Sequence, residues 1–341
     1  MKTSTLFKSI FIIGFLLFNT VISAQSKAEK KARKLYEKEK EAFQKSADNY
    51  KELNKRVRVS GEIAGNYEKK YNLKNNFCTA QDYDVPQKVG LLSFYIDDEE
   101  YKSYSSGGGW VTTYTYKASE KKVNMVAQLI YEQSISTLKE KFANSGMELL
   151  TPEEFLVTEK QKSMYYDTPM PILKGKAGIF DLLGSGSAVP EGFRFLPYSS
   201  YFIATGKPYA KEKDDFLDLM GMDALIVVAI QLSSAGGTVK GISATFFFKN
   251  PGYDNSDKVG TYPGGYPRYS QMTVRMNIAP PMRGFFIKKE EEYTNKKGKT
   301  EIRFVKTGVD PKFTNLVSCV IERAAKSAQS QIPMKDKKKK K

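Results

Sequence analysis

Four consecutive carboxylates are the residues of this chain best placed for acid–base chemistry. Asp97–Glu100 directly follow a predicted buried strand, a position where α/β proteins often place a site. Such a cluster could bind a cation or supply a general acid and base. Adjacent residues of an extended segment point to opposite faces, so the four carboxylates cannot all converge. We therefore interpret the run as a solvated acidic loop, with a site as the alternative.

A loop rich in glycine and proline, residues 250–269, carries a second acidic run and four tyrosines. The spacing of Asp254–Asp257 suits oxygen ligands of a Ca²⁺ ion, but the glycine and the closing glutamate of a calcium-binding hand are missing. A turn-rich loop explains the same residues. Tyrosines on such a loop are good contact residues, because the ring offers a wide apolar area with a polar tip. We predict a contact surface for a protein or glycan partner at Tyr253, Tyr262, Tyr266 and Tyr269, the alternative being that these rings pack back on the sheet.

The chain contains no histidine. This excludes Ser-His-Asp and Cys-His nucleophiles, and imidazole ligands for zinc, copper or haem iron. Acid–base chemistry falls to carboxylates, lysine or tyrosine. Gly184–Ser187 lacks the Gly-Lys-Ser/Thr ending of a phosphate-binding loop. We therefore predict no catalytic residue, no bound cofactor and no metal site.

The two cysteines, Cys78 and Cys319, lie far apart in the sequence. In an oxidising compartment they could form a disulfide that ties the start of the body to its last helix. That requires the fold to bring their Cβ atoms to about 4 Å. Two buried free thiols are the alternative.

The elements that must position these residues alternate between helix and strand. Residues 88–96 and 223–232 are apolar runs typical of buried strands, and 119–144 place their apolar residues on one helical face. Thr151 and Glu154 have the spacing of a capping box around Pro152. We predict an α/β (α+β) fold, in which a mixed sheet is flanked by helices. The other predicted elements are a loop or short hairpin within 101–116, a strand at 147–150, a short helix at 214–220, strands over 241–249 and 272–278, a hairpin within 283–306 and a last helix over 310–331.

Residues 27–57 contain neither glycine nor proline and predict one long basic helix. Its apolar residues form a thin stripe rather than a broad core face. We predict that this helix projects from the body, the alternative being an arm that lies across it.

The first residues are typical of a cleavable signal peptide. Lys2 and Lys8 precede the apolar run Ile10–Leu17, and Val21–Ala24 offers a small residue for cleavage. The apolar run is too short for a spanning helix, so we expect export rather than a retained anchor. We divide the chain into a signal peptide (1–24), a basic helical arm (25–58), an α/β body (59–334) with an irregular insertion near 165–213, and a lysine tail (335–341).

The net charge of +16 is concentrated at the two ends of the chain, 25–58 and 335–341. On an exported protein, basic ends favour anionic lipid or an acidic polymer over nucleic acid as partner. Lysines that only solvate disordered ends are the alternative. We expect envelope protein partners, a chain that does not span the membrane, an oligomer as one arrangement, and a location in the periplasm, at the outer membrane or outside the cell.

Three segments of the body resemble a known family. Val89–Phe94 (VGLLSF) opens the domain, the helix 119–144 leads to Leu149–Glu154 (LLTPEE), and Met220–Val227 (MGMDALIV) joins a helix to a strand. Together they resemble the small α/β domain shared by the curli-secretion lipoprotein CsgG, the amino-terminal domain of TolB and the LpoB-type activators. The resemblance covers 88–160 and 214–280. It implies an α/β fold that binds partners at the cell envelope, and it carries over no catalytic residue.

We therefore expect a non-enzymatic envelope protein with a binding or scaffolding role in assembly or secretion. One alternative is a glycan-active enzyme that uses two carboxylates among Asp97, Asp98, Asp254 and Asp257, held about 5 to 10 Å apart in a cleft. Another is a CsgG-like pore subunit, which requires lipid-facing apolar stripes within 101–117 and 241–279.

Overall fold

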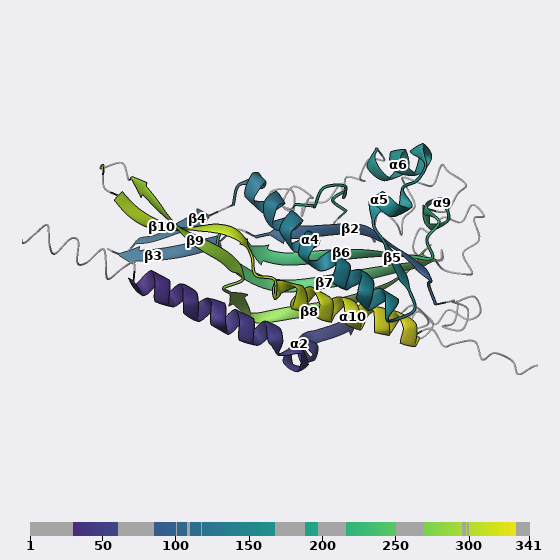
Figure 1. Ribbon diagram of the computed structural model, residues 1–341, viewed down its shortest axis with the longest axis horizontal. Helices are drawn as coiled ribbons and strands as arrows, with labels where there is room; N and C mark the ends of the chain where they lie inside the picture. The colour runs from purple at the N-terminus through teal and green to yellow at the C-terminus, as the bar shows by residue number, and fades with distance from the viewer. Residues whose placement is uncertain are drawn as a thin grey trace, which may run out of the picture.

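The computed structural model describes residues 30–60, 85–99, 101–107, 110–116, 118–167, 188–196, 216–249, 269–294, 298 and 300–331. A six-stranded sheet in the order β1-β8-β7-β6-β2-β5 forms its centre, with helices on both faces (Figure 1). The predicted α/β fold, a mixed sheet flanked by helices, is thereby confirmed. The strands are β1 (Val57–Ser60), β2 (Lys88–Asp98), β5 (Glu148–Leu150), β6 (Ala224–Ser233), β7 (Thr238–Lys249) and β8 (Tyr269–Arg283).

The chain connections diverge at the carboxyl end of β2. β2 runs parallel to both of its neighbours, β5 and β6, whereas β6, β7, β8 and β1 pair antiparallel. From the carboxyl end of β2 the chain continues to the β5 side, while β6 turns directly into β7 on the other side. Connections that diverge at the carboxyl ends of parallel strands leave room for a ligand between them.

One face of the sheet is covered by α4 (Glu120–Ala143), α10 (Phe313–Gln331) and α2 (Tyr50–Arg56). The apolar face predicted for α4 is the one that packs there, with Val123, Ile130 and Phe142 fully buried. The opposite face carries a smaller core beneath α5 (Pro152–Phe155), α6 (Glu159–Tyr166) and α9 (Phe216–Met220). The predicted capping box at the start of α5 is confirmed.

The N-terminal helix, helical over residues 30–48, lies across the body, so the prediction that it projects is wrong (Figure 1). Phe43 is buried against Phe285 and Phe313, with ring centroids 6.2 and 6.4 Å apart. The narrow apolar stripe is enough to hold the helix on the body, because aromatic rings of the body pack against it. The helix also ends earlier than predicted, since Asn49 caps the separate helix α2 and Val57–Ser60 form the edge strand β1.

Two hairpins complete the described chain. β3 (Tyr101–Gly107) pairs with β4 (Trp110–Tyr116), and β9 (Phe286–Thr294) pairs with β10 (Thr300–Val309), as predicted. Within the described residues, no helix is long and apolar enough to cross a membrane. The predicted signal peptide, most of the insertion near 165–213 and the lysine tail lie outside the described residues.

Candidate functional site

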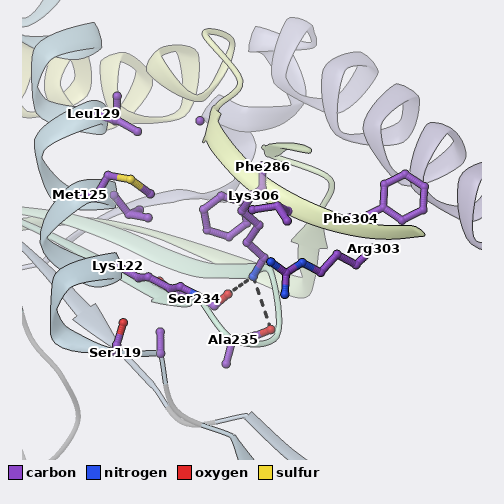
Figure 2. A pocket seen from close by; sticks show the side chains of 14 residues that line it. Ser119, Lys122, Met125, Leu129, Ser234, Ala235, Phe286, Arg303, Phe304 and Lys306 are labelled. Carbon is purple, nitrogen blue, oxygen red and sulfur yellow. Dashed lines mark hydrogen bonds between the residues drawn. The ribbon is translucent and has the colours of Figure 1, made fainter. Parts of the chain in front are cut away.

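A pocket of about 830 Å³ opens between the first turns of α4, strand β10 and the turn that joins β6 to β7 (Figure 2). Its position is beside the carboxyl ends of β2 and β6, where the connections diverge. Its size falls in the range of small-molecule sites. Polar lining residues are Ser119, Lys122, Ser234, Arg303 and Lys306, and apolar ones include Met125, Val126, Leu129, Phe286 and Phe304.

Lys306 of β10 is the central cation of the pocket. Its ammonium group donates hydrogen bonds to the backbone carbonyls of Ser234 and Ala235 and lies 4.4 Å from the ring centroid of Phe286 (Figure 2). Burial lowers the pKa of Lys306 to about 8, the charges of Lys288 and Lys122 act in the same direction, and the Asp98 carboxylate partly opposes them. The ammonium group is thus held where its charge is incompletely neutralised.

The carboxylates at the end of β2 fix the turn rather than face the pocket as a catalytic pair. Asp98 is buried, and its carboxylate accepts a hydrogen bond from the backbone N–H of Ser234. Burial raises the pKa of Asp98, and this hydrogen bond opposes the effect. The next residue, Glu99, forms an ion pair with Lys240. The predicted acidic run is therefore neither a fully solvated loop nor a cation site, because Asp98 is engaged with the β6–β7 turn and Glu99 with the following strand.

The remaining cations differ in how far they are neutralised. Arg303 is ion-paired with Glu291 at 2.9 Å and lies over the ring of Tyr293. Lys122 is exposed and forms no ion pair with a described residue. It stands in the first turn of α4, whose N-cap residue Ser119 makes no side-chain capping bond. The positive end of this 24-residue helix adds to the positive potential of Lys122 and Lys306.

Ser234 of the β6–β7 turn also lines the pocket. The residue is 4% exposed, and its buried Oγ makes no hydrogen bond of standard geometry with any described residue. The hydroxyl nevertheless lies close enough to the Asp98 carboxylate to help lower the pKa of that group. The side chain of Ser234 is therefore engaged with Asp98, and the turn offers the pocket mainly its backbone.

Taken together, the pocket joins incompletely neutralised lysines and a helix N-terminus to an apolar wall. Such an arrangement suits binding of a negatively charged group. In the part of the chain that the structure describes, no three acidic or cysteine side chains converge as metal ligands.

The tyrosines and most of the other residues singled out in the sequence are not tested by this geometry. Tyr269 begins β8, but its side chain is not among those described. The others, Tyr253, Tyr262, Tyr266, Asp254, Asp257 and Cys78, lie outside the described residues.

Cys319 lies in α10 as a buried free cysteine. Its thiol donates a hydrogen bond to Asn54 Oδ1 at 3.3 Å, and burial raises its pKa to about 11. The pairing with Cys78 stays a prediction.

The sequence does not single out two residues at the centre of the pocket, Lys306 and Ser234. Lys306 is one of many lysines in a predicted hairpin, and Ser234 follows an apolar strand without any motif around it. No local sequence pattern marks either residue, because the contact between them depends on how β10 crosses the β6–β7 turn.

Comparison with known proteins brings no independent identification. No protein-family model, no curated protein and no solved structure matches this chain. The resemblance to the CsgG, TolB and LpoB group therefore stays a prediction, and the function must be argued from the pocket.

Proposed function

We propose that this chain is a non-enzymatic, exported protein of the cell envelope that binds an anionic ligand in the pocket beside α4. The observation that carries the proposal is the convergence of Lys306, Lys122 and the amino end of α4 on one cavity. Two lysines without a neutralising carboxylate inside the cavity favour a ligand that brings its own negative charge. Export through residues 1–24 and the resemblance to envelope proteins support the compartment.

Binding is favoured over glycan hydrolysis by the state of the carboxylates. A glycosidase needs two carboxyl groups that face a cleft. Asp98 instead accepts the Ser234 N–H, and Glu99 is paired with Lys240. The cavity beside them is lined by cations rather than by carboxylates.

A pore subunit is disfavoured by the place of β7 and β8. Both strands lie inside the central sheet, where Phe246 and Met276 are fully buried beneath helices. The opposite face of β8 carries Thr273, Arg275 and Asn277 rather than a lipid-facing apolar stripe.

In this proposal the basic ends, 25–58 and 335–341, attach the protein to an envelope partner. They would hold the protein near an anionic lipid surface, an acidic polymer or a protein partner of the envelope. In the structure, Arg33 of the N-terminal helix is paired with Glu290 at 2.8 Å, so part of this charge is used within the body.

The test is to purify the native protein from the envelope fraction and identify the small molecules that come with it by mass spectrometry. We expect one anionic compound to accompany the wild type and to be lost from Lys306→Met. Lys289→Met is the matched control, because Lys289 is an exposed lysine of the same hairpin outside the pocket. A protein found only in the cytosol, or the same compounds on all three proteins, would contradict the proposal.

A further inference from the structure

The pocket has two chemically different halves, and we infer that its ligand is an anionic amphiphile, in which a carboxylate or phosphate group is joined to an unbranched hydrocarbon chain. The inference deepens the proposed function and rests on it. It requires that one half of the pocket select charge and that the other half select apolar surface.

The charged half is formed where α4 begins. Lys306 and Lys122 approach from opposite walls, and Lys306 is held by the carbonyls of Ser234 and Ala235 (Figure 2). No carboxylate is among the described residues that line this half. A carboxylate or phosphate here can accept hydrogen bonds from both lysines at once, and charge-assisted hydrogen bonds of this kind are strong.

The apolar half continues along α4 and β10. Met125 and Leu129 are one helical turn apart, so both face the pocket, on the side where the ring of Phe286 lies (Figure 2). Met125 is 41% exposed and is one of few large apolar side chains left exposed on the described surface. A flexible thioether beside aromatic rings adapts to varied apolar shapes. This wall therefore favours a hydrocarbon chain over a polar ligand body.

The boundary between the halves lies at Lys306. Its ammonium group stands 4.4 Å from the ring centroid of Phe286, so charge and apolar surface meet at one side chain. The pocket measures about 830 Å³, whereas one water takes about 30 Å³ of liquid volume. A small inorganic anion is also small on this scale, so it would occupy only the charged half. A neutral hydrocarbon would leave the lysines unpaired. Only a ligand with both features uses the whole pocket.

The experiment titrates the purified full-length protein with dansyl-undecanoate near neutral pH and follows the rise in dansyl fluorescence. Octanoate, decanoate, dodecanoate and dodecyl phosphate then compete below their micelle-forming concentrations. We expect competition to strengthen by about fourfold for each added CH₂ group. Carboxylate and phosphate amphiphiles of equal chain length distinguish the two headgroups. Inorganic phosphate and neutral dodecanol should compete at least tenfold more weakly than dodecanoate.

Two pocket variants and one control separate the halves. Lys306→Met should weaken dansyl-undecanoate binding at least tenfold, and Met125→Glu should do the same from the exposed helix surface, where a glutamate does not disturb folding. Lys289→Met should leave binding unchanged. Circular dichroism of each variant verifies the fold.

Each contrary outcome has its own meaning. If inorganic phosphate competes as well as dodecanoate and chain length has no effect, the amphiphile inference is wrong and anion binding stands. If dodecanol competes equally and Lys306→Met binds normally, the pocket selects apolar surface alone, and both the inference and the anionic proposal fall. If no probe binds although an anionic polar compound purifies with the native protein, the inference alone is overturned.

Discussion

The two ends of α4 hold charged side chains in opposite ways. At its carboxyl end, Lys141 meets Glu322 of α10 at 3.3 Å, and the same carboxylate accepts the hydroxyl of Tyr50 at 2.6 Å and the ammonium group of Lys326. At its amino end, Lys122 shares the pocket with Lys306, and no carboxylate is among the described residues that line this pocket. One end of the helix thus packs around a shared carboxylate, whereas the other end faces a cavity lined by cations.

The pKa values of Glu322 and Lys306 reflect the difference between the two ends of α4. Burial alone would raise the pKa of Glu322, but hydrogen bonds from Lys326, Tyr50 and Lys141 lower it to about 2. For Lys306, burial and neighbouring cations lower the pKa to about 8, although the Asp98 carboxylate opposes them. The fold therefore stabilises the charged form of Glu322 and destabilises the charged form of Lys306. A destabilised charge in a cavity is typical of a functional site, whereas a neutralised one is typical of a structural contact.

Glu322→Ala tests the structural end and should have the largest effect. It leaves the hydroxyl of Tyr50 and two lysines without their shared acceptor. We expect the free energy of unfolding to fall by about 2–3 kcal/mol, measured by urea denaturation, with unchanged dansyl-undecanoate binding. Glu140→Ala, at an exposed position of α4, is the control and should change stability by less than about 0.5 kcal/mol. Equal effects of the two variants would show that the Glu322 cluster contributes nothing.

Acid should weaken the same end. Because the pKa of Glu322 is about 2 in the folded protein and near 4.5 when unfolded, the unfolded state binds more protons between these values. Stability is therefore full above about pH 4.5 and is lost as the pH falls towards 2, by roughly 1–2 kcal/mol for this group. Comparing urea unfolding of wild type and Glu322→Gln over this range isolates the contribution. A stability difference that stays constant with pH would refute it.

The sequence predicted the elements of both ends but not what they bring together. The spacing of Val123, Ile130 and Phe142 defines α4 locally, and the capping box at Thr151 defines α5. Glu322 and Tyr50, in contrast, are 272 residues apart. A charge pattern at that separation has no local signal, because it depends on how the sheet places α2 beside α10.

The packing of the N-terminal helix likewise could not be predicted from local sequence. Its few apolar residues gave a thin stripe, from which we predicted that the helix projects. Phe43 nevertheless contacts Phe285 and Phe313, which follow in sequence more than 200 residues later. Whether a narrow stripe is buried depends on the surface that receives it, and that surface is formed only when β9 and α10 are in place.

The functional end should respond to alkaline pH. Lys306 loses its proton as the pH rises through about 8, while the carboxylate of dansyl-undecanoate stays ionised. We expect affinity to fall by about tenfold between roughly pH 7 and pH 9, since only the protonated fraction of the pocket binds well. Lys306→Arg keeps its charge over this range and should bind with little dependence on pH. A similar decline for wild type and for Lys306→Arg would assign the effect to another group.

The smallest and most direct test of the contrast replaces one lysine at each end of α4 by methionine. Lys141→Met removes one of the cations around Glu322, so stability should fall by about 0.5–1 kcal/mol while dansyl-undecanoate affinity is kept. Lys122→Met removes an exposed cation of the pocket, so affinity should fall by roughly threefold while stability is kept, because an exposed charge is strongly screened. The two variants have the same chemistry on the same helix, so each is the control for the other. If Lys122→Met lowers stability and leaves affinity intact, its charge serves the fold, and the amino end of α4 is not part of a ligand site.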